Sequence, residues 1–413
     1  MLFFALNALR AYFLETGEKM INEEMAKLGK KRSVIREIFE YANKRKAEIG
    51  EEKVFDFSIG NPSVPTPQEV TETMERLIKE TAPVKLHGYT SAQGAAGVRR
   101  AIAESIKKRF DFEADPDLIY MTCGAAASLT VSLNAVINRG DEVVIPSPYF
   151  PEYRVFAQKA GADVVEAPCR DGDFQLDLSV LEKAITAKTR AVIINSPNNP
   201  TGAVFSEETV RAVARLLSEK QEEYGTDIYI IADEPYRELT YGAFVPYIPK
   251  YYDNTVVCYS YSKSLSLPGE RIGYISVSPR IRSAGELYAA VCGAGRALGF
   301  VCAPSLLQYT VEKCVFVTPD VSVYKRNRDL LLNALTEYGC TVVPPDGAFY
   351  LFVKSPEPDA YAFCERAKKY ELLFVPGDDF GRKGYVRISY CVETGQIERS
   401  LPAFRALMNE YKK

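Results

Sequence analysis

The stretch YSYSKSLSLPGERIGY, residues 259–274, places one lysine, Lys263, directly after an apolar segment, TVVCYS (255–260). That segment has the composition of a buried strand, and a buried ammonium group is costly unless a specific partner holds it. Serines surround Lys263, and Arg271 follows eight residues later. We therefore infer that Lys263 forms an imine, and we expect the rest of the chain to supply the groups that an imine needs.

The composition argues against several classes of partner. The 51 basic and 54 acidic residues nearly balance, so we expect neither a nucleic acid nor a membrane as partner. The single histidine, His87, and the absence of any CxxC pair exclude zinc sites that combine cysteine with several histidines, and we expect no metal. Nine scattered cysteines favour core packing in a reducing cytoplasm over disulfide bonds.

The first nineteen residues are apolar but do not form a secretion signal. They lack a basic start and a small-residue cleavage site, and Asn7 and Arg10 interrupt the apolar run. We expect residues 1–19 to be an extension of the chain, with an amphipathic membrane or partner-binding helix as the alternative. No later stretch approaches the roughly 18 apolar residues that span a bilayer.

Short apolar runs recur along the middle of the chain, and segments with helical spacing separate them. The runs cover 117–122, 141–148, 190–197, 227–234, 255–260 and 273–279. This alternation predicts an α/β fold with a mostly parallel central sheet that is covered on both faces. Ligands of such sheets bind beyond the carboxyl ends of the strands, which is where the polar residues of interest follow.

The two ends of the chain have a different pattern. GAFYLFVK (347–354) and GYVRISY (384–390) resemble strands between long helical segments, which predicts a smaller second domain that the N-terminal segment joins. We predict an extension at 1–19, an N-terminal segment of the small domain at 20–66, a large domain at 67–309 and a small C-terminal domain at 310–413.

Four motifs carry candidate chemistry, and each has an ordinary structural alternative. MTCGAAASL (121–129) starts a helix with small residues, which suits a phosphate or a tight packing turn. NSPNNPTG (195–202) follows a buried strand and is also a typical loop composition. Asp233 ends another strand, where it pairs with a cation or caps a helix. Arg387 lies inside an apolar strand, where it needs a planar anion or a structural salt bridge.

Together and in this order, these motifs resemble the class I/II aminotransferases, the fold-type I family that uses pyridoxal 5′-phosphate. YTSAQGAAGVRRAI (89–102), SPYFPEY (147–153) and GAFY (347–350) add to the resemblance, which extends from about residue 32 to the C-terminus. The resemblance implies the central sheet of the pyridoxal-phosphate-dependent transferases, with a smaller α+β domain made from both chain ends. RSVIREIFEYA (32–42) and GNPSVPTP (60–67) are similar to bacterial enzymes described as aspartate aminotransferases.

The resemblance assigns roles to the residues around the cofactor ring. Lys263 would hold the cofactor aldehyde as a Schiff base and then move a proton between the substrate Cα and the cofactor C4′. Asp233 would keep the pyridine nitrogen protonated, because an opposite charge favours that form. Tyr236 and Asn199 would donate hydrogen bonds to the phenolate oxygen, and Phe150 would stack on the ring.

The resemblance also implies how the phosphate and the substrate bind. The phosphate ligands would be Ser260, Ser262, Arg271 and the backbone N–H groups of Ala125 and Ala126. Tyr89 would reach the phosphate from the neighbouring subunit, which implies a homodimer with shared active sites. Arg387 would bind the substrate α-carboxylate with help from the Gly60 backbone, and Phe349 would form a wall of the pocket. Arg296 either contacts a substrate side-chain carboxylate across the dimer or is an interface or surface residue.

The favoured activity is transfer of an amino group from aspartate to the 2-oxo acid 2-oxoglutarate. Alanine and aromatic amino acids are alternative substrates, because SPYFPEY supplies aromatic surface. Carbon–sulfur β-elimination is a second hypothesis, since lyases share this scaffold and these residues. A cofactor-bearing sensor module of a transcription regulator is a third, and the complete catalytic set argues against it.

Overall fold

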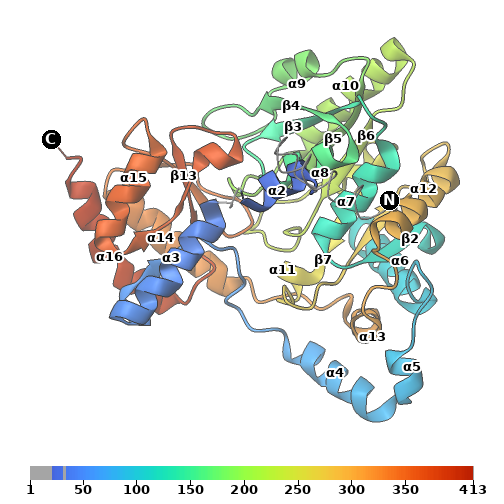
Figure 1. Cartoon of the computed structure of the whole chain (residues 1–413), viewed down its shortest axis with the longest axis horizontal. Coiled ribbons are helices and arrows are strands. Elements are labelled where there is room, and N and C mark those ends of the chain that lie inside the picture. The colour runs from blue at the N-terminus through green and yellow to red at the C-terminus, as the bar shows by residue number, and fades with distance from the viewer. Residues whose placement is uncertain (1–20, 31–33, 413) are drawn as a thin grey trace, which may run out of the picture.

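A computed structural model describes residues 21–30 and 34–412, so the predictions for residues 1–19 lie outside the described residues. Figure 1 shows a larger body around a central sheet and a smaller body that contains the C-terminal elements. The central sheet has seven strands in the order β2-β8-β7-β6-β5-β3-β4. Its strands are β2 (Ile119–Thr122), β3 (Glu142–Ser147), β4 (Asp163–Pro168), β5 (Thr189–Asn195), β6 (Tyr229–Asp233), β7 (Thr255–Ser260) and β8 (Gly273–Val277).

The pairing of these strands confirms the predicted α/β fold with a mostly parallel sheet. Strands β4, β3, β5, β6 and β7 run parallel, while β8 is antiparallel to both of its neighbours, β7 and β2. Each of the six apolar runs contains one strand. The seventh strand, β4, lies at the sheet edge and is only partly buried, so it lacks the continuous apolar run by which the other strands were found.

Both faces of the sheet are covered, as its sequence pattern requires. In β5, Val192 and Ile194 point into one hydrophobic cluster, and the alternate residues Ala191 and Ile193 point into another. Helix α10 (Glu207–Tyr224) covers the first face and α7 (Ala125–Val136) covers the second. The remaining helices of the larger body are α4 (Gln68–Glu80), α5 (Pro83–His87), α6 (Ala96–Phe110), α8 (Glu152–Ala160), α9 (Leu178–Ala184), α12 (Ala284–Leu298) and α13 (Ser305–Cys314).

The smaller body combines both ends of the described chain. Its four-stranded sheet has the order β12-β13-β10-β9, and a separate parallel pair joins β1 to β11. These strands are β1 (Phe55–Asp56), β9 (Thr341–Val342), β10 (Tyr350–Lys354), β11 (Leu372–Leu373), β12 (Val375–Pro376) and β13 (Tyr385–Ser389). Its helices are α3 (Val34–Ile49), α14 (Ser322–Glu337), α15 (Ala360–Ala367) and α16 (Thr394–Asn409), with α2 (Glu23–Lys30) preceding them.

Helix α3 attaches to the C-terminal strands through a narrow apolar stripe. Ile38 and Ala42, one helical turn apart, are buried in a cluster with Phe352, Leu373 and Val375. The N-terminal segment therefore packs against strands that are encoded more than 300 residues later. The numerical domain limits proposed from the sequence remain predictions.

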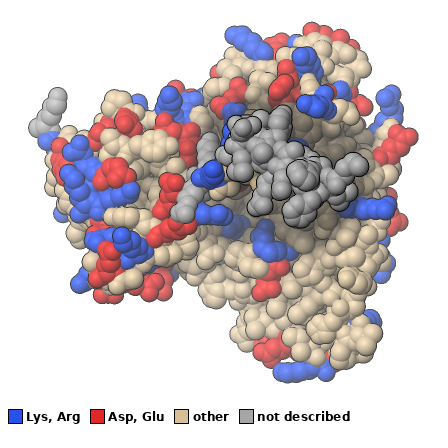
Figure 2. Space-filling view, viewed as in Figure 1, with Lys and Arg blue, Asp and Glu red and all other residues tan. Residues whose placement is uncertain are grey.

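The carboxyl ends of β5, β6 and β7 lie at the edge of the sheet that faces the smaller body. Because these strands are parallel neighbours, their last residues Asn195, Asp233 and Ser260 come together there. On the face in Figure 2, basic and acidic side chains are interspersed over both bodies. Among residues 21–30 and 34–412, no helix combines the length and the apolar composition that crossing a bilayer requires.

Candidate active site

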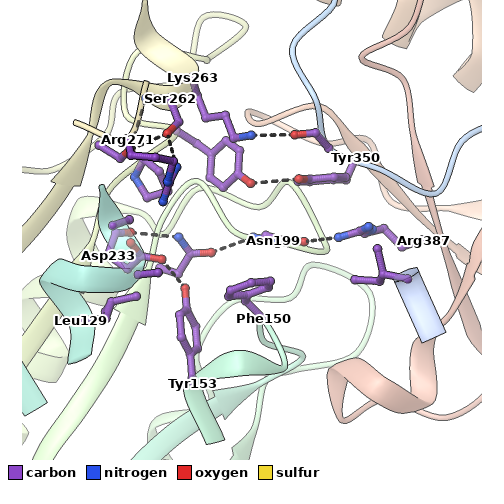
Figure 3. A pocket seen from close by; sticks show the side chains of 18 residues that line it. Leu129, Phe150, Tyr153, Asn199, Asp233, Ser262, Lys263, Arg271, Tyr350 and Arg387 are labelled. Carbon is purple, nitrogen blue, oxygen red and sulfur yellow. Dashed lines mark hydrogen bonds between the residues drawn. The ribbon is translucent and has the colours of Figure 1, made fainter. Parts of the chain in front are cut away.

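A cavity of about 280 Å³ lies between the edge of the central sheet and the smaller body. In Figure 3, Lys263, Arg271 and Asp233 lie on one side of it and Arg387 on the other. The two sides come from different sheets, since Asp233 ends β6 and Arg387 lies in β13. The cavity therefore joins chemistry-bearing residues from both bodies of the molecule.

Lys263 follows β7 in the short helix α11 (Tyr261–Ser264) and points into the cavity. Its Nζ donates a hydrogen bond of 2.6 Å to the carbonyl oxygen of Gly60. Burial lowers the pKa of Lys263 from 10.5 to about 8, and the positive charges of Arg271 and Arg387 act in the same direction. A substantial fraction of the amine is therefore neutral near neutral pH, and the neutral form is the nucleophile.

Asp233 is 4 % exposed, and its two carboxylate oxygens have different surroundings. Oδ2 accepts a short hydrogen bond from the hydroxyl of Tyr153. Oδ1 is buried and has no hydrogen-bond partner within the part of the chain that the structure describes. Burial raises the pKa of Asp233 to about 7. A donor that carries positive charge would satisfy Oδ1 and keep the carboxylate ionised.

A cluster of hydrogen-bond donors lies where β7 meets α7. Ser260 Oγ and Ser262 Oγ are 2.8 Å apart, and Arg271 Nη1 donates to Ser262 Oγ over 3.3 Å. Helix α7 begins after Gly124, and Ala125 and Ala126 of its first turn line the same cavity. Exposed N–H groups at a helix start, two hydroxyls and a guanidinium together suit a phosphate dianion.

Glycine is required at position 124 for two reasons. Its φ of +87° lies in the region that side chains rarely adopt, and a Cβ there would come within 2.6 Å of Arg271 Nη2. The Arg271 guanidinium therefore lies directly against the backbone that opens α7. This close approach places the positive charge of Arg271 beside the positive N-terminal end of α7.

Arg387 is buried without a carboxylate partner among residues 21–30 and 34–412. Its Nη2 donates 2.6 Å to the carbonyl oxygen of Ser58, and its Nη1 donates 3.0 Å to Oδ1 of Asn199. Its Nε has no hydrogen-bond partner in the described chain. Burial lowers the pKa of Arg387. The structural salt bridge considered above is thus absent from the described residues, and the guanidinium suits an entering anion.

Tyr236 and Tyr350 close the cavity between these groups. Their hydroxyl oxygens are 2.9 Å apart, and the ring of Tyr350 lies 4.6 Å from the guanidinium carbon of Arg387. Phe150 and Asn199 also line the cavity. The arrangement brings an amine, a carboxylate, two phenols and an aromatic face around one space.

The residues that line the cavity fit pyridoxal 5′-phosphate. The unpartnered Oδ1 of Asp233 suits a pyridine nitrogen that carries a proton, and the donor cluster beside Gly124 suits the phosphate. The Lys263 amine has the lowered pKa that reaction with an aldehyde needs. Within the described residues there is no group of three or more His, Cys, Asp or Glu side chains that could hold a metal ion.

The structure brings most of the predicted residues together. The cavity is lined by Gly60, Ala125, Ala126, Phe150, Asn199, Asp233, Tyr236, Ser260, Ser262, Lys263, Arg271 and Arg387. Phe349 is fully buried with its ring centroid 5.4 Å from Lys263 Nζ, and the next residue, Tyr350, lines the cavity in its place. Tyr89 is 98 % exposed, Arg296 is exposed on α12, and neither lines the cavity of this subunit. Their roles across a dimer stay predictions.

Tyr153 and Tyr350 are the residues that the sequence analysis missed. Both lie in motifs that it used: Tyr350 ends GAFY, and Tyr153 ends SPYFPEY one helical turn after Phe150. A signal was therefore present in the motifs, because both tyrosines lie within a few residues of predicted site residues. The other lining residues that had not been predicted are Ile35 of α3, Leu129 of α7, Asn195 at the end of β5, and Pro235.

Comparisons with known proteins agree with this geometry. The family model described as aminotransferase class I and II matches residues 52–404. A relative from Methanocaldococcus jannaschii named "Probable aspartate aminotransferase" is 32 % identical over 382 residues, which are 90 % of this chain and 96 % of the relative. "Aromatic-amino-acid aminotransferase 2" from Thermococcus litoralis is 30 % identical over 92 % of this chain and 96 % of its own. The crystal structure of an amino transferase from Eubacterium rectale has 54 % identity and a TM-score of 0.94, covering 96 % of this chain and all of that one.

Proposed function

This chain belongs to the class I and II aminotransferases, which use pyridoxal 5′-phosphate, and we propose that the cavity around Lys263 is where it moves an amino group between an L-amino acid and a 2-oxo acid. One observation carries the proposal. Three residues that line the same cavity carry the needed groups: Lys263 has an amine with a lowered pKa, while Oδ1 of Asp233 and Nε of Arg387 have no hydrogen-bond partner in the described chain. An aldehyde would react with the amine, and a protonated ring nitrogen and a carboxylate would supply the two missing partners.

The cofactor would be held by residues of the larger body. Bound pyridoxal 5′-phosphate supplies an aldehyde that takes up amino groups and a ring that accepts the electrons left at the substrate Cα. Ser260, Ser262 and Arg271 would bind its phosphate with the first N–H groups of α7. Phe150 would cover one face of the ring. Tyr236 and Asn199 would donate hydrogen bonds to its phenolate oxygen.

The substrate would be oriented from the smaller body. Arg387 would bind the α-carboxylate with two N–H groups, a geometry that fixes the substrate as well as attracting it. The neutral Lys263 amine would then take the proton from the substrate Cα and deliver it to the cofactor C4′. Nζ donates a hydrogen bond of 2.6 Å to the Gly60 carbonyl oxygen, and this bond would restrain the amine between the substrate Cα and the cofactor C4′.

We propose aspartate and 2-oxoglutarate as the substrate pair, since the relative from M. jannaschii carries that amino acid in its name. In the described chain, the three cations that line the cavity all have other roles, so the side-chain carboxylate would need Arg296 from the partner subunit. Aromatic amino acids are the second candidate. The aromatic and aliphatic lining of Ile35, Leu129, Phe150 and Tyr350 favours them, as does the name of the T. litoralis relative.

A panel of amino acids tests both proposals. Each amino acid is mixed with the cofactor-loaded protein in the absence of a 2-oxo acid, and the change in the cofactor absorption bands is followed. Aspartate should react fastest. Equal or faster reaction with phenylalanine or alanine would exclude the dicarboxylate preference, and no reaction with any L-amino acid would exclude amino transfer. Lys263→Ala should abolish the reaction and the attachment of cofactor by borohydride.

A homodimer in the cytoplasm is the proposed setting. Tyr89 is 98 % exposed, Val84 88 % and Val301 40 %, and a partner subunit would cover such apolar side chains. Light scattering in solution should give twice the mass of 46.1 kDa. Tyr89→Phe should weaken cofactor binding without changing the mass, whereas a monomeric protein with full activity would contradict the shared site.

A further inference from the structure

The carboxylate of Asp233 has one hydrogen-bond partner within the described chain, the hydroxyl of Tyr153. Tyr153 lies in α8 and is 2 % exposed, so its hydroxyl reaches Asp233 from beneath the cavity (Figure 3). The bond is made to Oδ2. The other oxygen, Oδ1, is buried without a partner among described residues, in a residue that lines the cavity.

We propose that Tyr153 is a positioning residue that fixes the orientation and the charge of Asp233, so that the proton between this carboxylate and the cofactor ring stays on the ring nitrogen. This inference rests on the proposed function. By donating to Oδ2, the phenol turns Oδ1 toward the cavity. By donating to the ionised form, it opposes the uptake of a proton by a carboxylate that is fully buried.

The hydrogen bond from Tyr153 matters because the other surroundings of Asp233 favour its protonated form. Burial raises the pKa of Asp233 to about 7, the Tyr153 hydrogen bond lowers it, and the neighbouring charge of Glu234 raises it again. The other titratable groups that interact with Asp233 are Tyr236 and Cys258, and neither is a cation. Within residues 21–30 and 34–412, Asp233 forms no ion pair, and Arg237 is bound to Glu234. Without Tyr153, the buried carboxylate has no favourable contact and takes up a proton.

The position of the Tyr153 hydroxyl is set by the packing of its ring. The ring of Phe150 meets it edge to face at 5.6 Å, and the ring of Tyr149 stacks at 6.5 Å. Phe150 lines the cavity two residues before α8 begins, and the Tyr153 N–H donates to the Phe150 carbonyl oxygen over 3.0 Å. SPYFPEY (147–153) therefore carries two functions on one side of a helix start: a ring that covers the cofactor and a phenol that holds the carboxylate beneath it.

Tyr149 provides a matched control four residues earlier. Its hydroxyl donates to Glu166 over 2.7 Å and accepts from Arg154 Nε over 3.3 Å, so it makes no contact with Asp233. Tyr149→Phe and Tyr153→Phe each remove one phenol oxygen from neighbouring rings. Only the second should affect the cofactor.

The experiment follows the ring proton directly. Wild type, Tyr153→Phe and Tyr149→Phe are loaded with pyridoxal 5′-phosphate that is isotope-labelled at the ring nitrogen, and the nitrogen resonance is recorded across pH. Wild type and Tyr149→Phe should show the protonated-ring position, while Tyr153→Phe should move toward the neutral-ring position. Its kcat should fall roughly 10-fold to 100-fold with little change in KM. A nitrogen resonance in Tyr153→Phe that matches wild type would overturn the proposal.

Two further measurements keep the outcome unambiguous. In an Asp233→Asn background, Tyr153→Phe should cause no additional shift of the nitrogen resonance, and an equal additional shift would show that Tyr153 acts without Asp233.

If wild type does not take up the cofactor, the proposed function fails, and the inference is tested in the cofactor-free protein instead. There the isotope-labelled carboxyl of Asp233, identified by its loss in Asp233→Asn, should titrate at higher pH in Tyr153→Phe. An unchanged titration would refute the role of Tyr153.

Discussion

The hydroxyl oxygens of Tyr236 and Tyr350 lie 2.9 Å apart, which joins the loop after β6 to strand β10 of the smaller body. The same Tyr350 ring lies 4.6 Å from the guanidinium carbon of Arg387. Tyr236 of the larger body and Arg387 of the smaller body therefore both contact one tyrosine. Burial raises the pKa of Tyr350 to about 12, so both phenols stay protonated and one donates to the other throughout the physiological range.

Gly60→Ala should disturb this shared tyrosine. A Cβ at position 60 would overlap the Tyr350 hydroxyl and approach the Phe349 ring to 3.1 Å, so Tyr350 must shift away from Tyr236. We expect the free energy of unfolding to fall by about 1–3 kcal/mol and the affinity for amino acids to fall with it. Gly285→Ala, at a helical glycine whose Cβ would meet nothing within 4 Å, is the control and should be neutral or stabilising. Denaturant titration measures the free energy of unfolding of both variants. Equal values for Gly60→Ala and Gly285→Ala would mean that position 60 has room for a side chain.

The reaction of the cofactor-free protein with pyridoxal 5′-phosphate should accelerate as pH rises to about 8. The pKa of Lys263 is lowered to about 8, so half of the amine is neutral near that pH and the gain in rate levels off above it. The unfolded chain binds this proton more tightly, so the free energy of unfolding of the cofactor-free protein should rise as pH increases from about 8 to 10.5. Stopped-flow absorbance measures the rate, with free lysine as the comparison. A rate that keeps climbing to the ordinary lysine pKa would show that Lys263 is not perturbed.

Arg387→Ala should weaken the binding of both the amino acid and the 2-oxo acid. Removal of one partner from a buried charged contact costs about 2–5 kcal/mol, which is roughly 30-fold to 3,000-fold in affinity. Arg387→Lys should recover part of this loss, because it keeps the charge without the planar fork. Arg405→Ala, at an exposed arginine whose contact with Glu337 is 3.4 Å, serves as the control. Titration of the cofactor bands measures both affinities, and unchanged values would make Arg387 a structural residue.

Gly124→Ala should weaken cofactor binding through the phosphate alone. A Cβ there would approach Arg271 Nη2 to 2.6 Å and would force an unfavourable φ of +87°. We expect the affinity for pyridoxal 5′-phosphate to fall roughly tenfold or more, while that for pyridoxal, which lacks the phosphate, changes little. Gly140→Ala has a similar φ of +91° and open space around its Cβ, so it reproduces the backbone strain without the contact. Equal losses in the two variants would assign the effect to strain.

Local sequence pattern was enough to predict the central sheet, and the resemblance to a known family predicted most of the cavity lining. Continuous apolar runs mark strands that are buried on both faces, and the edge strand β4 escaped because its residues are partly exposed. The contacts that distinguish this site depend on distant segments. Tyr153 and Asp233 are 80 residues apart, and Tyr236 and Tyr350 are 114 residues apart. Such pairs are set by how helices and sheets pack together, and no local spacing encodes them.

The order in which the ribosome produces these parts has a consequence of its own. Strand β1 pairs with β11, with Phe55 opposite Leu372, so its partner is synthesised more than 300 residues later, a delay of roughly 15–60 s at about 5–20 residues per second. Lys263, Asp233 and Arg271 emerge within that interval, and Arg387 only after it. Under the proposed function, the growing polypeptide thus completes the residues expected to hold the vitamin before the arginine expected to bind the amino acid.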